Sequence, residues 1–188
     1  MLHWERIKKI IQNPNFLTLF RMASSLFILL LLLRPNRLTA FLAALLFSLA
    51  AITDFFDGFF ARRYGTVSNF GKAMDPLADK LLVSTSLIMM SSHGWIPAWI
   101  ACIIIGREIA VTGLRNVIAG RGEDIAASLL GKYKTGFQIA AIIPLLLHYP
   151  YFGLRFHLIG IWLLWGALIF TLWSGADYFY RFRRLLEK

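Results

Sequence analysis

Residues 54–79 read DFFDGFFARRYGTVSNFGKAMDPLAD and place four aspartates among apolar side chains. Asp54 and Asp57 are three positions apart near the end of one long apolar run. Asp75 and Asp79 are four positions apart at the start of the next run. On a helix, either spacing puts both side chains of a pair on one face. We therefore expect two consecutive antiparallel helices whose four carboxylates meet at one edge of a membrane.

The flanking sequence predicts an all-α, polytopic membrane protein. The 188 residues are 58% hydrophobic and only 16% charged, which is more apolar than an ordinary soluble domain. A transmembrane helix needs about 20 mostly apolar residues. Residues 1–13 are expected to form an amphipathic juxtamembrane helix, and residues 14–188 a domain of six transmembrane helices. The six candidate spans are 15–33, 38–62, 76–93, 97–118, 135–150 and 156–180.

The basic residues predict an orientation. The chain has 20 Lys and Arg residues against 10 Asp and Glu, a net charge of +10. With both termini in the cytoplasm, the outer connections hold only Arg34, Arg37 and Arg155, in agreement with the positive-inside rule. We expect a membrane protein with its aspartates on the cytoplasmic side. The apolar runs are too long for a nucleic-acid-binding protein, and no nucleic-acid partner is expected.

The aspartates predict a metal site. Charged side chains inside a transmembrane helix are costly and mark functional sites by default. Four clustered carboxylates repel one another unless cations bind them. Oxygen donors without nearby His or Cys select hard ions. Mg²⁺ or Mn²⁺ is expected, and two adjacent ions are a common arrangement for phosphoryl transfer.

Small and basic residues near the aspartates suit a phosphate ligand. Gly58 and Gly71 leave room for a diphosphate, and Arg62 lies one helical turn beyond Gly58, where it could bind a phosphate. Taken singly, the glycines are equally consistent with close helix packing, and Arg62 with a membrane anchor.

Together these residues form the pattern D-x₂-D-G-x₂-A-R-x₈-G-x₃-D-x₃-D, which resembles at every fixed position the signature of the CDP-alcohol phosphotransferases. The resemblance implies a six-helix homodimer. It implies that Asp54, Asp57, Asp75 and Asp79 bind two metal ions and that Asp79 is also the catalytic base. It further implies a pocket for the CDP-lipid. Its residues would be Gly58, Ala61, Arg62 and Gly71.

Further cations predict an anionic acceptor. Arg107 lies near the middle of the fourth span, where an unpaired arginine is costly, and Glu108 is a candidate ion partner. Arg115 follows on the same helix stripe, and Lys132 and Lys134 precede the fifth span. We assign the acceptor phosphate to Arg107, Arg115, Lys132 and Lys134, although the two lysines are equally consistent with anchoring to the inner leaflet.

Three more segments extend the resemblance: PNFLTLFR (14–21), REIAVTGLR (107–115) and GKYKT (131–135). They are similar to bacterial members of the family that use CDP-diacylglycerol as donor and sn-glycerol 3-phosphate as acceptor. Two interpretations stay open for Asn15, Thr18 and Arg21. They help to hold the nucleotide, or they cap the start of the first helix.

Other functions stay open at this point. Within the family, inositol phosphate, phosphatidylglycerol and serine are competing acceptors. Outside it, intramembrane charges also occur in transporters, although no repeated halves are evident. A catalytically silent membrane scaffold is the third class. Near the end of the last span, Asp177 is placed to pair with Arg181, four residues on.

Overall fold

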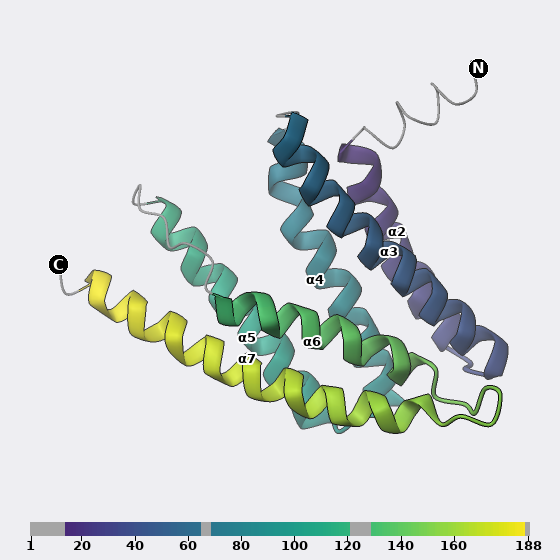
Figure 1. The fold of residues 1–188 in the computed structure, drawn as a ribbon. Coiled ribbons are helices and arrows are strands. Elements are labelled where there is room, and N and C mark those ends of the chain that lie inside the picture. The colour runs from purple at the N-terminus through teal and green to yellow at the C-terminus, as the bar shows by residue number, and fades with distance from the viewer. Residues whose placement is uncertain (1–13, 65–68, 121–128, 187–188) are drawn as a thin grey trace, which may run out of the picture. The chain divides into compact units, whose positions relative to one another are not determined.

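The structure is a computed structural model that describes residues 14–64, 69–120 and 129–186. Within these ranges the chain forms six α-helices and no strand (Figure 1). It divides into two compact units between Met89 and Met90. The helices are α2 (Pro14–Leu32), α3 (Arg37–Tyr64), α4 (Asn69–Ser92), α5 (Ala98–Gly120), α6 (Leu129–Leu146) and α7 (Phe156–Leu186).

Each helix corresponds to one of the six apolar segments, so the all-helical prediction is confirmed for the described residues. The expected juxtamembrane helix, residues 1–13, lies outside them. Two helices begin earlier than predicted. α4 begins at Asn69, so that Pro76 is inside the helix and not at its first turn. α6 begins at Leu129, which places Lys132 and Lys134 in the helix and not in a loop before it.

In the first unit, α2 and α3 pack side by side (Figure 1). The turn between them is set by Asn36, whose Oδ1 accepts hydrogen bonds from the backbone nitrogens of Leu38 (2.9 Å) and Thr39 (3.0 Å). Thr39 Oγ1 in return accepts one from the Asn36 nitrogen at 2.9 Å. This reciprocal cap satisfies backbone donors that the first turn of a helix leaves unpaired, and it fixes where α3 begins.

α4 ends in a glycine cap. Gly94 has a φ of 70°, a left-handed conformation that glycine adopts without steric cost. The Gly94 nitrogen donates to the Ser91 carbonyl and the Trp95 nitrogen to the Met90 carbonyl, both at 2.9 Å. These are the two hydrogen bonds of a Schellman motif, and Met90 and Trp95 are both buried beside it.

In the second unit, α6 and α7 form a tightly packed antiparallel hairpin. A Cβ atom at Gly160 would lie 2.7 Å from Leu145 Cγ, and one at Gly166 would lie 3.0 Å from Phe137 Cδ1. Both glycines therefore allow the two helices to approach closely. At the hairpin tip, Phe152 and Gly153 have φ values of 52° and 77°. Positive φ at both central residues is the requirement of a type I′ turn.

Two histidines and a tryptophan pack beside this tip. The His148 ring stacks on Trp95 with centroids 4.3 Å apart, and its Nδ1 lies 3.3 Å from Nδ1 of His157.

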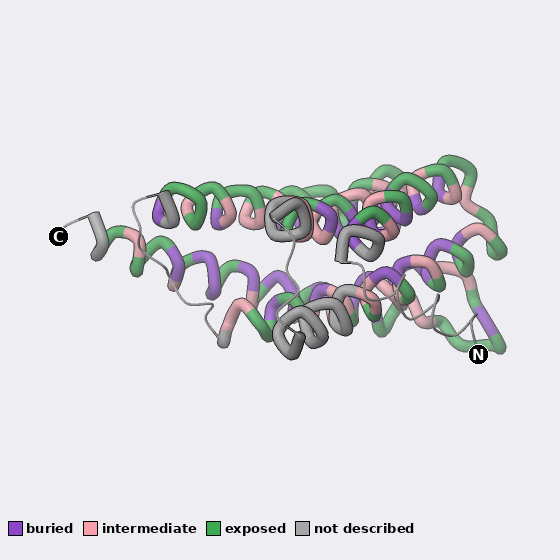
Figure 2. The backbone as a smooth tube through the Cα atoms, turned by 90° about the horizontal axis from the view of Figure 1, so that it is seen from above, coloured by how far each residue is buried: buried purple, intermediate pink, exposed green. Residues whose placement is uncertain are grey.

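Buried and exposed residues both occur along the helices (Figure 2), and many of the exposed residues have large apolar side chains. In α7, Trp162 and Trp173 are 78% and 60% exposed, whereas Thr171 and Ser174 are fully buried. By length and composition, one helix among the described residues can cross a membrane, Phe156–Arg183, and Thr18–Leu32 and Arg37–Thr53 are shorter apolar helices. The count of six spans stays a prediction.

Candidate active site

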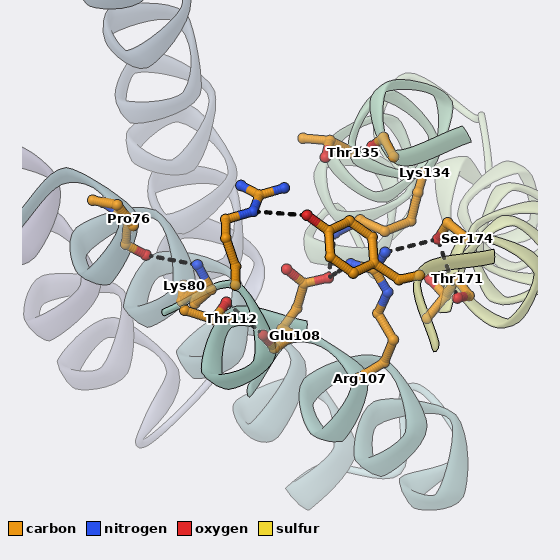
Figure 3. A network of polar contacts seen from close by, with 12 residues as sticks. Pro76, Lys80, Arg107, Glu108, Thr112, Lys134, Thr135, Thr171 and Ser174 are labelled. Carbon is orange, nitrogen blue, oxygen red and sulfur yellow. Dashed lines mark hydrogen bonds and ion pairs between the residues drawn. The ribbon is translucent and has the colours of Figure 1, made fainter. Parts of the chain in front are cut away.

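A polar cluster lies between α5, α6 and α7 in the second unit. It consists of Arg107, Glu108, Lys134 and Ser174, whose side chains converge in Figure 3. Glu108 accepts hydrogen bonds from Lys134 Nζ and, at 3.2 Å, from Arg107 Nη1. The expected ion partnership of Arg107 and Glu108 is therefore confirmed. The structure adds Lys134 as a second cation on the same carboxylate oxygen.

The cluster is largely withdrawn from solvent. The side chains of Lys134, Arg107 and Glu108 are 5%, 13% and 16% exposed. Arg107 Nη2 donates to Ser174 Oγ at 3.0 Å, and Ser174 is fully buried. Two cations thus share one acid. Because charge in such surroundings is weakly screened, the excess positive charge makes this a favourable place for an anion.

Arg115 is held by a separate contact to α7. Its Nε donates to the Tyr178 hydroxyl at 3.0 Å, and its guanidinium carbon lies 5.6 Å from the centroid of the Tyr178 ring. Tyr178 is buried, but Arg115 itself stays exposed. Arg115 is therefore anchored and still accessible to a ligand.

Lys132 is not part of this arrangement. It lies two residues before Lys134 on α6, a spacing that directs side chains to different faces of a helix. Lys132 is exposed and lines a shallow apolar groove with Tyr133, Phe137 and Leu163. The structure thus joins Arg107 and Lys134 through Glu108. Arg115 lies on α5, as Arg107 does, and both arginines contact α7. Lys132 is separate from these contacts.

In the first unit, two residues of α2 hold an aspartate of α4. Arg21 Nη2 donates to Asp75 Oδ1 at 2.8 Å, and Thr18 Oγ1 donates to the same oxygen. Thr18 and Arg21 are buried, whereas the Asp75 side chain is 38% exposed. Both α2 residues therefore bind the Asp75 carboxylate and do not cap the helix. Sequence reasoning found the residues but not this contact.

Asp75 and Asp79 lie one turn apart on α4, and both are partly exposed. One turn after Pro76, Lys80 Nζ donates to the Pro76 carbonyl at 3.1 Å (Figure 3). Two carboxylates on one face suit a hard divalent cation. Among the described residues, no group of three or more His, Cys, Asp or Glu side chains is arranged so that it could hold a metal ion. The remaining site residues lie outside the described side chains: Asp54, Asp57, Gly58, Ala61, Arg62, Gly71 and Asn15.

The contribution of α7 was not predicted from the sequence. Ser174 and Tyr178 are four positions apart, so they lie on one face of the helix, and both contact an arginine of α5. The available signal was a polar stripe in an otherwise apolar segment. The neighbouring prediction was correct, because Arg181 Nε donates to Asp177 Oδ1 at 3.1 Å.

Comparison with known proteins agrees with the motif. The family model of the CDP-alcohol phosphatidyltransferases matches residues 11–173. A Bacillus subtilis (strain 168) protein named CDP-diacylglycerol–glycerol-3-phosphate 3-phosphatidyltransferase is 47% identical over 178 residues, which cover 88% of this chain and 92% of the relative.

Two further relatives carry the same name. The protein of Rickettsia bellii (strain RML369-C) is 40% identical, and the match covers 91% of this chain and 96% of the relative. That of Shigella flexneri serotype 5b (strain 8401) is 38% identical, with 88% and 91% covered. Such identity over nearly the full length of both chains shows common ancestry, and the chain belongs to the CDP-alcohol phosphatidyltransferase family.

Proposed function

We propose that this chain transfers the phosphatidyl group of CDP-diacylglycerol to sn-glycerol 3-phosphate and releases phosphatidylglycerophosphate and CMP. The donor follows from the family and from the names of the relatives. The observation that supports the acceptor is the pair of cations, Arg107 and Lys134, around one acid in a nearly buried cluster. An acceptor with its own phosphate supplies the anion that such a cluster favours.

The acceptor phosphate is assigned to Arg107, Arg115 and Lys134. Their α5 and α6 positions are fixed by packing against α7, and each of the three has a polar partner that orients it. Lys132, on another face of α6, is assigned to the outer edge of the acceptor site or to the membrane surface.

The aspartates of α3 and α4 are assigned to metal binding. Asp54, Asp57, Asp75 and Asp79 would hold two divalent ions, Mg²⁺ or Mn²⁺. Such ions neutralise the charge that develops on the attacking and leaving oxygens during phosphoryl transfer. Thr18 and Arg21 orient Asp75 through its Oδ1 oxygen. Gly58, Ala61, Arg62, Gly71 and Asn15 are assigned to the CDP-lipid.

Asp79 is assigned as the general base. It accepts the proton of the acceptor hydroxyl while that oxygen forms a bond to the β-phosphorus of CDP-diacylglycerol. The bond from this phosphorus to the oxygen of CMP breaks, and CMP leaves with the electron pair. A general base must lie within hydrogen-bond reach of the proton that it removes, and the assignment is supported by the position of Asp79 one turn after Asp75 on α4.

The chain is assigned to the bacterial inner membrane as a homodimer with six spans, both termini and the active site being cytoplasmic. Two observations support a membrane location. α7 is long and apolar enough to span a bilayer, and its large apolar side chains are exposed while Thr171 and Ser174 are buried. A soluble helix shows the opposite distribution.

An acceptor panel tests the assignment. Purified protein with CDP-diacylglycerol and Mg²⁺ or Mn²⁺ is offered glycerol 3-phosphate, inositol phosphate, phosphatidylglycerol or serine, and CMP release is measured. We expect glycerol 3-phosphate to give the highest kcat/KM. A preference for serine, which carries no phosphate, would refute the role assigned to Arg107 and Lys134.

A further inference from the structure

We propose that α7 carries the positioning residues of the acceptor site: Ser174, Gly175 and Tyr178 hold Arg107 and Arg115 in the orientation that receives the acceptor phosphate. This inference rests on the proposed function. It adds a role for the last helix, which contributes none of the four motif aspartates and none of the four cations assigned from the sequence.

Ser174 orients Arg107. Its hydroxyl donates to the Thr171 carbonyl at 3.2 Å, so its lone pairs are left to accept the hydrogen bond from Arg107 Nη2 at 3.0 Å. Arg107 Nη1 is bound to Glu108. The two terminal nitrogens are thus fixed by different helices, which restricts the rotation of the guanidinium plane.

Gly175 leaves room for the Arg107 side chain. A Cβ atom at this position would lie 3.4 Å from Arg107 Cγ and 3.9 Å from Arg107 Nε. The aliphatic part of Arg107 therefore runs directly over the backbone of α7. A Cβ atom at these distances makes ordinary van der Waals contact with Arg107, and we expect a bulkier side chain to compete with Arg107 for this space.

Tyr178 performs the same task for Arg115, one turn further along α7. Arg115 makes two contacts with Tyr178: its Nε donates to the hydroxyl, and its guanidinium lies over the ring. Together they restrict the position and the rotation of the guanidinium. Tyr178 is 2% exposed and so has a fixed position itself. Because the contact uses Nε and Arg115 remains exposed, the terminal nitrogens of Arg115 are accessible to a ligand.

Residues that act by positioning these arginines should affect the acceptor and not the donor. When a charged side chain is already ordered before the ligand binds, the entropy cost of binding is smaller. Loss of either contact should therefore raise KM for glycerol 3-phosphate. The KM for CDP-diacylglycerol should not change, since that lipid is assigned to other residues.

The test compares Tyr178→Phe and Ser174→Ala with Tyr180→Phe, a matched control at an exposed position of α7. Tyr178→Phe keeps the ring and removes only the hydroxyl. We expect each of the first two variants to raise KM for glycerol 3-phosphate about tenfold, the size of one hydrogen bond to a charged group. The KM for CDP-diacylglycerol should stay within about twofold of the wild type, and Tyr180→Phe should match the wild type in both.

A readout without catalysis accompanies the kinetics. Glycerol 3-phosphate alone should raise the melting temperature of the wild type and of Tyr180→Phe more than that of Tyr178→Phe or Ser174→Ala. Ser174→Thr, which keeps a hydroxyl, should restore part of the affinity. A merely structural role would lower the melting temperature without ligand and leave both KM values equal to the wild type.

The outcomes separate the two proposals. If the wild type releases no CMP with glycerol 3-phosphate, the proposed function fails. If the wild type is active but Tyr178→Phe and Ser174→Ala bind glycerol 3-phosphate as tightly as the wild type, the positioning role of α7 is wrong and the proposed function stands. Equal rises in both KM values would also overturn the positioning role.

Discussion

Gly160 and Gly136 should respond in opposite ways to the same substitution by alanine. A Cβ atom at Gly160 would lie 2.7 Å from Leu145 Cγ and 2.8 Å from the Leu145 backbone nitrogen, whereas one at Gly136 would meet no described atom within 4 Å. Because a backbone nitrogen cannot move away by itself, Gly160→Ala must push α6 and α7 apart. Gly136→Ala requires no movement.

The expected magnitudes follow from these contacts. Alanine in place of a helical glycine gains about 0.5–1 kcal/mol from backbone entropy, and this is the whole effect expected at Gly136. Overpacking costs about 1–3 kcal/mol, so Gly160→Ala should lose about 1 kcal/mol net. A difference of about 2 kcal/mol between the variants corresponds to roughly 4–8 °C in Tm for a chain of this size.

The assay is thermal unfolding of both variants in the same detergent, with KM for glycerol 3-phosphate measured in parallel. α6 carries Lys134 and α7 carries Ser174, so separation of the two helices should also raise the acceptor KM of Gly160→Ala. Gly136→Ala should keep the wild-type KM. If Gly160→Ala melts at the same temperature as Gly136→Ala or above it, the close packing of the hairpin is refuted.

Three further substitutions test the polar contacts. Arg21→Met should lower the free energy of unfolding by about 1.5 kcal/mol. This is the low end for a hydrogen bond to a charged group, because the Asp75 side chain is 38% exposed. A denaturant titration measures this loss, and an unchanged unfolding midpoint would contradict the prediction. Glu108→Gln leaves two nearly buried cations without their shared acid and should lower the free energy of unfolding by about 3 kcal/mol. Asp177→Asn removes an exposed ion pair and should lower it by less than about 1 kcal/mol. Equal losses for the two variants in the same titration would refute the buried cluster.

The helices could be predicted from the sequence because apolar runs of sufficient length are a local property. The two early helix starts could not. The third candidate span begins at residue 76, but the helix begins at Asn69 and contains Pro76. The fifth candidate span begins at residue 135, whereas α6 begins at Leu129 and includes the polar stretch GKYKT, whose lysines are good helix formers.

The site could be predicted to the extent that its residues lie close together in sequence. The common face of Asp75 and Asp79 follows from helix geometry alone, and Glu108 was a candidate partner of Arg107 because the two residues are adjacent in sequence. The contact of Arg21 with Asp75 joins residues 54 positions apart, and that of Arg107 with Ser174 joins residues 67 apart. Such contacts depend on how the helices pack, which a single sequence does not specify.

Transfer of radiolabelled glycerol 3-phosphate into chloroform-extractable lipid tests the proposed reaction and the role of Asp79 together. With CDP-diacylglycerol and Mg²⁺ or Mn²⁺, the wild-type protein should form labelled phosphatidylglycerophosphate and an equal amount of CMP. Asp79→Asn should abolish both products, and Asp177→Asn, an acid outside the motif, should leave them unchanged. Absence of labelled lipid with the wild type, or undiminished transfer by Asp79→Asn, would contradict the proposed chemistry.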